Sequence, residues 1–62
     1  DVVYIEGLPA QPYNVEVFNS SGAPVYRQLN MLNNRLKLDR LQPGLYFIVI
    51  NNGQYRFKLM KL

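Results

Sequence analysis

The sequence predicts a small all-β domain, an antiparallel sandwich or barrel of six short strands. Apolar and polar residues alternate with a period of two along most of the chain, and no segment sustains the spacing of an amphipathic helix. Turn-forming residues separate the alternating segments at intervals of roughly 8 to 12 residues. The 62 residues allow one domain, so we expect residues 1–62 to be a single domain. A start at Asp1 indicates a fragment of a longer parent protein.

The first two predicted strands lie on either side of a proline-containing interruption. Residues 2–6 alternate as a short strand. Residues 7–12 then contain two prolines, which cannot donate a hydrogen bond to a β-ladder. Residues 13–17 alternate again and predict a half-buried strand.

The middle of the chain carries a third and a fourth strand between polar turns. Residues 19–22 form a turn cluster in which Gly22 can supply a positive φ. Residues 24–32 alternate imperfectly, which predicts a β-bulge or a strand end. The two asparagines at residues 33–34 predict a two-residue hairpin loop, because asparagine tolerates the left-handed region. Leu36 and Leu38 alternate with Arg35 and Lys37, so residues 35–38 would form the short strand that follows.

A turn-rich segment precedes the most apolar strand. Asp39 can cap a single helical or 3₁₀ turn, and Pro43 and Gly44 fit the central positions of a type II turn. Residues 45–50 are apolar on both faces, which predicts a central strand that needs cover on both sides. In a domain this small, a partner chain or a neighbouring domain of the parent could supply the second cover.

The last two strands supply much of the predicted core. Tyr46 and Phe47 lie on opposite faces of one strand, so at least one should be well buried, and we expect Phe47→Ala to cost about 3 to 5 kcal/mol. Asn52-Gly53 predicts a hairpin. In the closing strand, Tyr55, Phe57 and Leu59 would lie on the core face and Arg56 and Lys58 on the opposite face.

Composition argues against catalysis. The chain has no cysteine and no histidine, which excludes disulfides, thiolate-bound metals and the commonest general base. The four glycines stand alone at turns and form no phosphate-binding loop, and the acidic residues lack a predicted cleft. We therefore expect no catalytic residue, no metal and no cofactor, and the absence of a long apolar run predicts no membrane insertion.

Two weaker patterns have simpler explanations. Asn19-Ser20-Ser21 fits a glycosylation acceptor, but it is already explained as a turn. The net charge is +3, and basic residues interleave with aromatic ones, as in surfaces that stack single-stranded nucleic acid. Those residues are Tyr26, Arg27, Arg35, Lys37, Tyr55, Arg56, Phe57 and Lys58. Because Tyr55 and Phe57 are assigned to the core, we expect no nucleic-acid binding.

Four segments follow one another in the order of a known family. A short apolar strand ending in glycine precedes a strand, polar turn and strand within VEVFNSSGAPVYRQ, and LQPGLYFIVI follows with the pattern L-x-x-G-L-Y. A lysine-bearing strand, QYRFKLMKL, closes the chain. The matching residues are Val3, Ile5, Gly7, Val15, Val17, Phe18, Asn19, Gly22, Val25, Leu41, Gly44, Leu45, Tyr46, Phe57, Lys58, Leu59 and Lys61. In this order the chain resembles the type A C-terminal sorting domains of proteins exported by the type IX secretion system of the Bacteroidetes.

The resemblance implies a folded secretion signal. The expected fold is a small immunoglobulin-like antiparallel β-sandwich of six to seven short strands. Such a domain directs its parent cargo from the periplasm through the outer-membrane translocon. A sortase-like peptidase then usually removes it, and the cargo is attached to an anionic lipopolysaccharide. The implied location is the periplasm in transit and afterwards the outer-membrane surface or the extracellular space.

The resemblance also implies where recognition lies. The translocon and the sortase-like peptidase would bind the closing strand, at Phe57, Lys58, Leu59, Met60, Lys61 and Leu62. A terminal edge strand can offer its backbone to a partner by β-augmentation. The family's turn and core motif corresponds to Gly22, Leu41, Gly44, Leu45 and Tyr46.

A second reading of the same fold stays open at this point. The domain could be an immunoglobulin-like structural or adhesive module that the mature surface protein retains. Unpaired strand edges would also allow a homodimer. Removal or retention of the domain in the mature parent distinguishes the sorting signal from the retained module.

Overall fold

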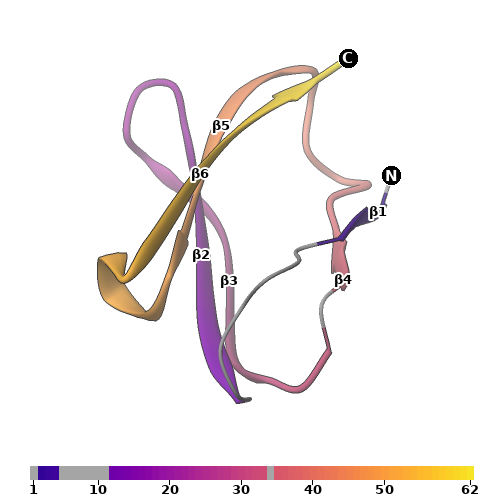
Figure 1. Cartoon of the computed structure of the whole chain (residues 1–62). Coiled ribbons are helices and arrows are strands. Elements are labelled where there is room, and N and C mark those ends of the chain that lie inside the picture. Colours follow the sequence, from indigo (N-terminus) through magenta and orange to yellow (C-terminus); the bar gives the residue numbers. More distant parts are fainter. Residues whose placement is uncertain (1, 5–11, 34) are drawn as a thin grey trace.

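A computed structural model describes residues 2–4, 12–33 and 35–62, which form six strands and one short 3₁₀ segment (Figure 1). The elements are β1 (Val2–Tyr4), β2 (Tyr13–Asn19), β3 (Pro24–Met31), β4 (Arg35–Lys37), β5 (Gly44–Ile50), η1 (Asn51–Gly53) and β6 (Tyr55–Lys61). Every strand pairing among them is antiparallel, which confirms the all-β prediction. The predicted continuation of the first strand and the turn at residues 7–11 lie outside the described residues.

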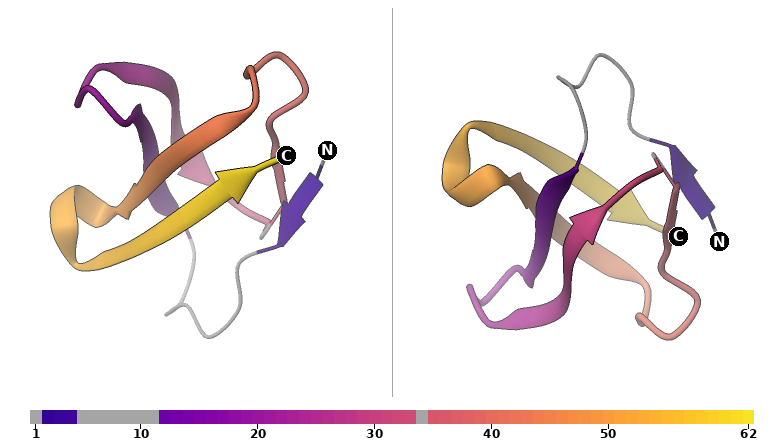
Figure 2. Two further views of the ribbon diagram at one scale, coloured as in Figure 1. Left: turned by 90° about the horizontal axis from the view of Figure 1, so that it is seen from above. Right: turned by 90° about the horizontal axis from the view of Figure 1, so that it is seen from below.

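The described strands form two sheets. The larger has the order β3-β2-β5-β6, and the smaller is the pair β1-β4. Leu36 and Leu38, from β4 and the residue after it, belong to the same buried cluster as side chains of the larger sheet. The smaller sheet therefore covers one face of the larger one, as the two views in Figure 2 show. We call the covered face the inner face and the opposite one the outer face.

The inner face forms the core because alternate residues of the paired strands point to it. Val15 pairs with Ile50 and Val17 pairs with Ile48, and cross-strand partners share a face. The buried residues are Tyr13, Val15, Val17, Met31, Leu36, Leu38, Tyr46, Ile48 and Ile50. The buried residues of β2 follow its predicted alternation, and those of β5 (Tyr46, Ile48 and Ile50) lie on one face of that strand.

A bulge in β3 confirms the irregularity that the sequence predicted. Tyr13 of β2 pairs with Met31, but Val15 pairs with Gln28, so β3 contains one extra residue in this stretch. Asn30 has a φ of 55°, in the left-handed region. The extra residue shifts the alternation, so that Met31 points to the inner face and is buried.

β5 is the central strand, as predicted, because it pairs with β2 on one side and β6 on the other. Tyr46 is 6% exposed, which confirms that one of the two aromatic residues is well buried. Phe47 lies on the outer face and is 37% exposed. The large loss of stability expected for Phe47→Ala assumed a buried ring, and that assumption is wrong. Truncating a ring that faces solvent leaves no core cavity.

The predicted hairpin loop at residues 33–34 is wrong. β3 pairs with β2 and β4 pairs with β1, so the chain changes sheets between β3 and β4 instead of folding back. Asn33 ends the crossing with a local turn, in which its Oδ1 accepts the backbone N–H of Arg35 at 2.9 Å. Asparagine was correctly read as a turn former, but the turn connects two sheets.

The segment before β5 also differs from its prediction. The single turn expected after Asp39 is present. In this turn the backbone N–H of Leu41 donates to the carbonyl of Leu38 at 3.1 Å. The type II turn is wrong: its third position needs a φ near 80°, whereas Gly44 has 153° and is already the first residue of β5.

The two turns with glycine or asparagine at positive φ were read correctly as turns. Asn19 Oδ1 accepts the backbone N–H groups of Ser21 and Ala23, each at 3.0 Å, beside Gly22 with a φ of 87°. This explains the potential glycosylation pattern as turn chemistry. The hairpin at Asn52-Gly53 is confirmed by the pairing of β5 with β6, with a loop of residues 51–54.

Candidate functional site

β6 lies at the edge of the larger sheet. It pairs with β5 from Tyr55 opposite Ile50 to Lys61 opposite Gly44. No described strand lies on its other side, and Figure 1 shows it running along the front of the sheet toward the C-terminus. An edge strand of seven residues offers unpaired backbone groups to an incoming strand.

The six residues predicted for recognition point in different directions. Phe57, Leu59 and Lys61 pair with Ile48, Tyr46 and Gly44 and share the inner side, whereas Lys58 and Met60 pair with Phe47 and Leu45 and share the outer side. Leu62 follows the strand and is 98% exposed. The predicted division of β6 into a core side and a basic side is confirmed, but the ring of Phe57 is 40% exposed at the sheet edge.

The outer face carries a shallow hollow of about 350 Å³ beside β6. We call it the outer hollow, and its lining residues are Phe47, Val49, Arg56, Phe57 and Lys58. Phe47 and Val49 supply apolar surface and Arg56 and Lys58 rim it, while Phe57 lines the hollow as the residue between these two cations. Its acidic neighbour, Glu16, lies opposite Val49 and approaches Arg27 at 4.0 Å. The hollow thus combines apolar and positive surface next to a free strand edge.

Lys61 binds the chain that precedes β5. Its Nζ donates to the carbonyl of Leu38 at 2.8 Å and also to the carbonyl of Leu41. The residue is partly buried, and its position opposite Gly44 directs its side chain inward. A lysine predicted for partner recognition therefore holds the end of β6 to the turn at residues 38–41.

Tyr46 fixes the same segment with a further hydrogen bond. Its hydroxyl donates to the carbonyl of Gln42 at 2.5 Å, and its ring is part of the core. Leu41 packs against that core from the turn, and Gly44 starts β5 two residues before Tyr46. The L-x-x-G-L-Y pattern and Lys61 together form one anchored connection, which we call the Lys61 clamp. Leu45, by contrast, is half-buried on the outer side opposite Met60.

Comparison with known families decides the identity. A family model described as "Secretion system C-terminal sorting domain" matches residues 1–62. The chain belongs to this family of type IX secretion sorting domains. The sorting domain is therefore a signal for export by type IX secretion, and its parent is an exported protein. No curated protein and no solved structure matched the chain in the corresponding searches.

The described part of the sorting domain was also searched for metal sites and membrane-spanning helices. Among residues 2–4, 12–33 and 35–62, no three His, Cys, Asp or Glu side chains gather where they could hold a metal ion. No helix in that part of the chain has the length and apolarity to cross a membrane.

Sequence reasoning missed the clamp, and it predicted a second apolar face on the strand at residues 45–50 without the basic rim of the outer hollow. Lys61 continues the alternation of Tyr55, Phe57 and Leu59, so its position already indicated an inward side chain. Phe47 and Val49 form the second apolar face of a central strand, which indicated an uncovered surface. What the sequence could not show is that the carbonyl groups held by Lys61 lie 20 and 23 residues away.

We expect Lys61→Met to lower the free energy of unfolding of the sorting domain by about 1.5 to 3 kcal/mol. Methionine keeps an apolar stem but removes hydrogen bonds that a charged group makes to two carbonyls. Urea denaturation followed by circular dichroism measures the loss. Lys58→Met is the matched control, because Lys58 is exposed on the outer face and its loss should stay within about 0.5 kcal/mol. Equal losses in the two variants would contradict the clamp.

Proposed function

We propose that the type IX translocon recognises this sorting domain through the outer hollow and the free edge of β6. The main support is that Phe47 and Val49, on the central strand, line an open hollow whose rim is formed by Arg56 and Lys58. An apolar patch with a polar rim is typical of a protein–protein contact site. The partner would place an apolar side chain against Phe47 and Val49 and a carboxylate beside Arg56 and Lys58.

The free edge of β6 supports the same partner. A strand added along β6 would bond to its outward backbone groups and bring its side chains over Lys58 and Met60. Phe57 and Leu62 offer further exposed apolar surface at that edge. Lys61 and Leu59 are assigned a supporting role, because they hold β6 in place and do not face outward.

We also propose that the two sheets belong to an immunoglobulin-like sandwich. The support is that two antiparallel sheets enclose one apolar core in a chain of 62 residues. The domain catalyses nothing itself in this account. It passes through the periplasm with its cargo to the outer-membrane surface, where a sortase-like peptidase removes it and the cargo is attached.

Export of a reporter tests the sorting role. A secreted fluorescent protein carrying residues 1–62 at its C-terminus should reach the cell surface or medium of a host with an intact type IX system. In the same host without its translocon, the fusion should stay in the periplasm. Equal surface amounts in the two hosts would contradict the proposal.

The fate of the domain separates removal from the retained module. A sorting domain that is cleaved should be missing from the mature surface protein, so intact-mass spectrometry of the exported fusion should find a C-terminus before β1. A retained structural or adhesive module would leave residues 1–62 on the mature protein. If export were unchanged and the domain were still present, the proposed cleavage would be wrong and the domain would be a retained module.

A further inference from the structure

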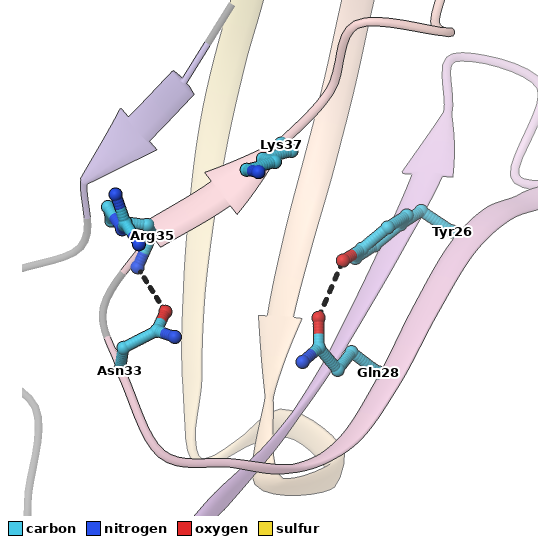
Figure 3. Close-up of a pocket in the computed structure, with 5 residues that line it drawn as sticks. All are labelled: Tyr26, Gln28, Asn33, Arg35 and Lys37. Atoms are coloured by element: carbon cyan, nitrogen blue, oxygen red, sulfur yellow. Dashed lines mark hydrogen bonds between the residues drawn. The ribbon is translucent and has the colours of Figure 1, made fainter.

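A second hollow, of about 270 Å³, opens between β3 and β4 on the far side of the domain from β6. We call it the inter-sheet pocket, and its lining residues are Tyr26, Gln28, Asn33, Arg35 and Lys37. Figure 3 shows Tyr26 and Gln28 extending from β3 toward Arg35 and Lys37 on β4, with Asn33 below them. The pocket shares no residue with the outer hollow.

Polar side chains occupy inner-face positions at this pocket. Gln28 pairs with Val15 and Tyr26 pairs with Val17, and both valines are fully buried. The register therefore gives Gln28 a place that a sandwich normally fills with an apolar residue. A polar residue at such a position loses packing unless it serves another purpose. The inner face is left open here and lined with hydrogen-bonding groups.

The opposite wall is positively charged. Arg35 and Lys37 flank the buried Leu36 on β4, and both are exposed. No acidic side chain lines the pocket, and neither cation makes an ion pair within the described part of the chain. The pKa of the Asp39 carboxyl is lowered, chiefly by the amino-terminal charge and to a smaller extent by Lys61 and Lys37, so one acidic group lies near this wall. Two cations this close in sequence on one strand create a positive potential that attracts anions.

The hydrogen bonds within the pocket leave its donors available. The hydroxyl of Tyr26 donates to Gln28 Oε1 at 2.7 Å, and the backbone N–H of Arg35 donates to Asn33 Oδ1 at 2.9 Å. Both amide oxygens are thus engaged, whereas each amide NH₂ group keeps its donor capacity. The pocket presents two amide donors, a guanidinium and an ammonium.

The position of Asn33 is fixed from the core. The hydroxyl of Tyr13 donates to the carbonyl of Asn33, and burial raises the pKa of Tyr13, so this hydroxyl stays protonated at neutral pH. Tyr13 is itself buried on β2. One wall of the pocket is therefore tied to the larger sheet, and the donors are held before a ligand arrives.

We propose that the inter-sheet pocket binds a small oxyanion, a carboxylate or a phosphate group. A ligand rich in acceptors matches a lining rich in donors, and the guanidinium of Arg35 can hold two of its oxygens at once. Lys37 supplies a second charge and Gln28 and Asn33 bind the remaining oxygens. The volume lies just below the range of drug-sized sites, which fits a single small group. This binding does not depend on the sorting role.

A nuclear magnetic resonance titration tests the site. The 62-residue chain, labelled with ¹⁵N in Tris buffer of low salt, is titrated separately with sodium phosphate and sodium glucuronate. We expect saturable shifts of the side-chain NH₂ signals of Gln28 and Asn33 and of the backbone amides near Arg35. Shifts with phosphate alone assign a phosphate, shifts with glucuronate alone assign a carboxylate, and shifts with both support a general oxyanion site.

Matched variants locate the binding. Arg35→Gln with Lys37→Gln should weaken it about tenfold or more, whereas Arg56→Gln with Lys58→Gln removes the same charge from the outer hollow and should leave it within about twofold. Both pairs are exposed, and the dispersion of each spectrum reports its folding directly. Sodium chloride and glucose provide the ionic-strength and neutral-sugar comparisons. Shifts that chloride reproduces, or an equal loss in the two double variants, would overturn the proposal.

Discussion

We expect Ile50→Ala to lower the free energy of unfolding by about 2 to 5 kcal/mol. Ile50 is fully buried at the end of β5, opposite Val15 of β2 and Tyr55 of β6. Truncation removes apolar contacts to both neighbouring strands and leaves a cavity that two paired strands cannot easily close. A domain of 62 residues has a total stability of roughly 3 to 9 kcal/mol, so this single change can unfold most molecules.

Phe47→Ala provides the matched comparison on the same strand. Its ring is larger, but it is 37% exposed on the outer face, so we expect a loss of about 1 to 2 kcal/mol. Urea denaturation monitored by circular dichroism gives both values under identical conditions. A greater loss for Phe47→Ala than for Ile50→Ala would show that the core lies on the opposite side of β5.

Reversing charge at the outer hollow should reduce export about tenfold or more. Arg56→Glu with Lys58→Glu changes the rim of Phe47 and Val49 from positive to negative, and juxtaposed like charges cost several kcal/mol at an interface. Both side chains are exposed, so the fold should be retained. The surface fraction of a fused reporter, measured with a protease that cannot enter the cell, gives the effect.

The control for this pair is Arg35→Glu with Lys37→Glu. It makes the same change in net charge on β4, away from the outer hollow, and should leave export within about twofold. Circular dichroism of both variants confirms that each remains folded. Equal export of the two variants would contradict a role of the outer hollow in recognition.

The parts of the fold that depend on local chemistry were predictable. The alternation in β2 and β6, the apolar run of β5 and the asparagine-glycine loop each identify an element from neighbouring residues. The central place of β5 was predicted from its apolar residues on both faces, and β5 does lie between β2 and β6, although the outer face carries an open hollow where the prediction required cover.

The parts that depend on distant segments were not predictable. Asn33 is a turn former in either arrangement, and only the pairing of β4 with β1 shows that the chain changes sheets there. The same limit applies to the candidate site. Lys61 was predicted as a recognition residue from its place in the closing strand, and the sequence did not show that its Nζ binds the carbonyls of Leu38 and Leu41.

The central claim is that recognition depends on a folded surface built from β5 and β6. The most direct measurement compares the export of two reporter fusions in one host with an intact type IX system: residues 1–62, and residues 54–62 alone. The short fusion keeps β6 but lacks Phe47, Val49 and the strand that holds β6 in place. We predict surface display for the full domain and periplasmic retention for the short tail. Equal display of the two fusions would contradict the account and assign recognition to a linear tail.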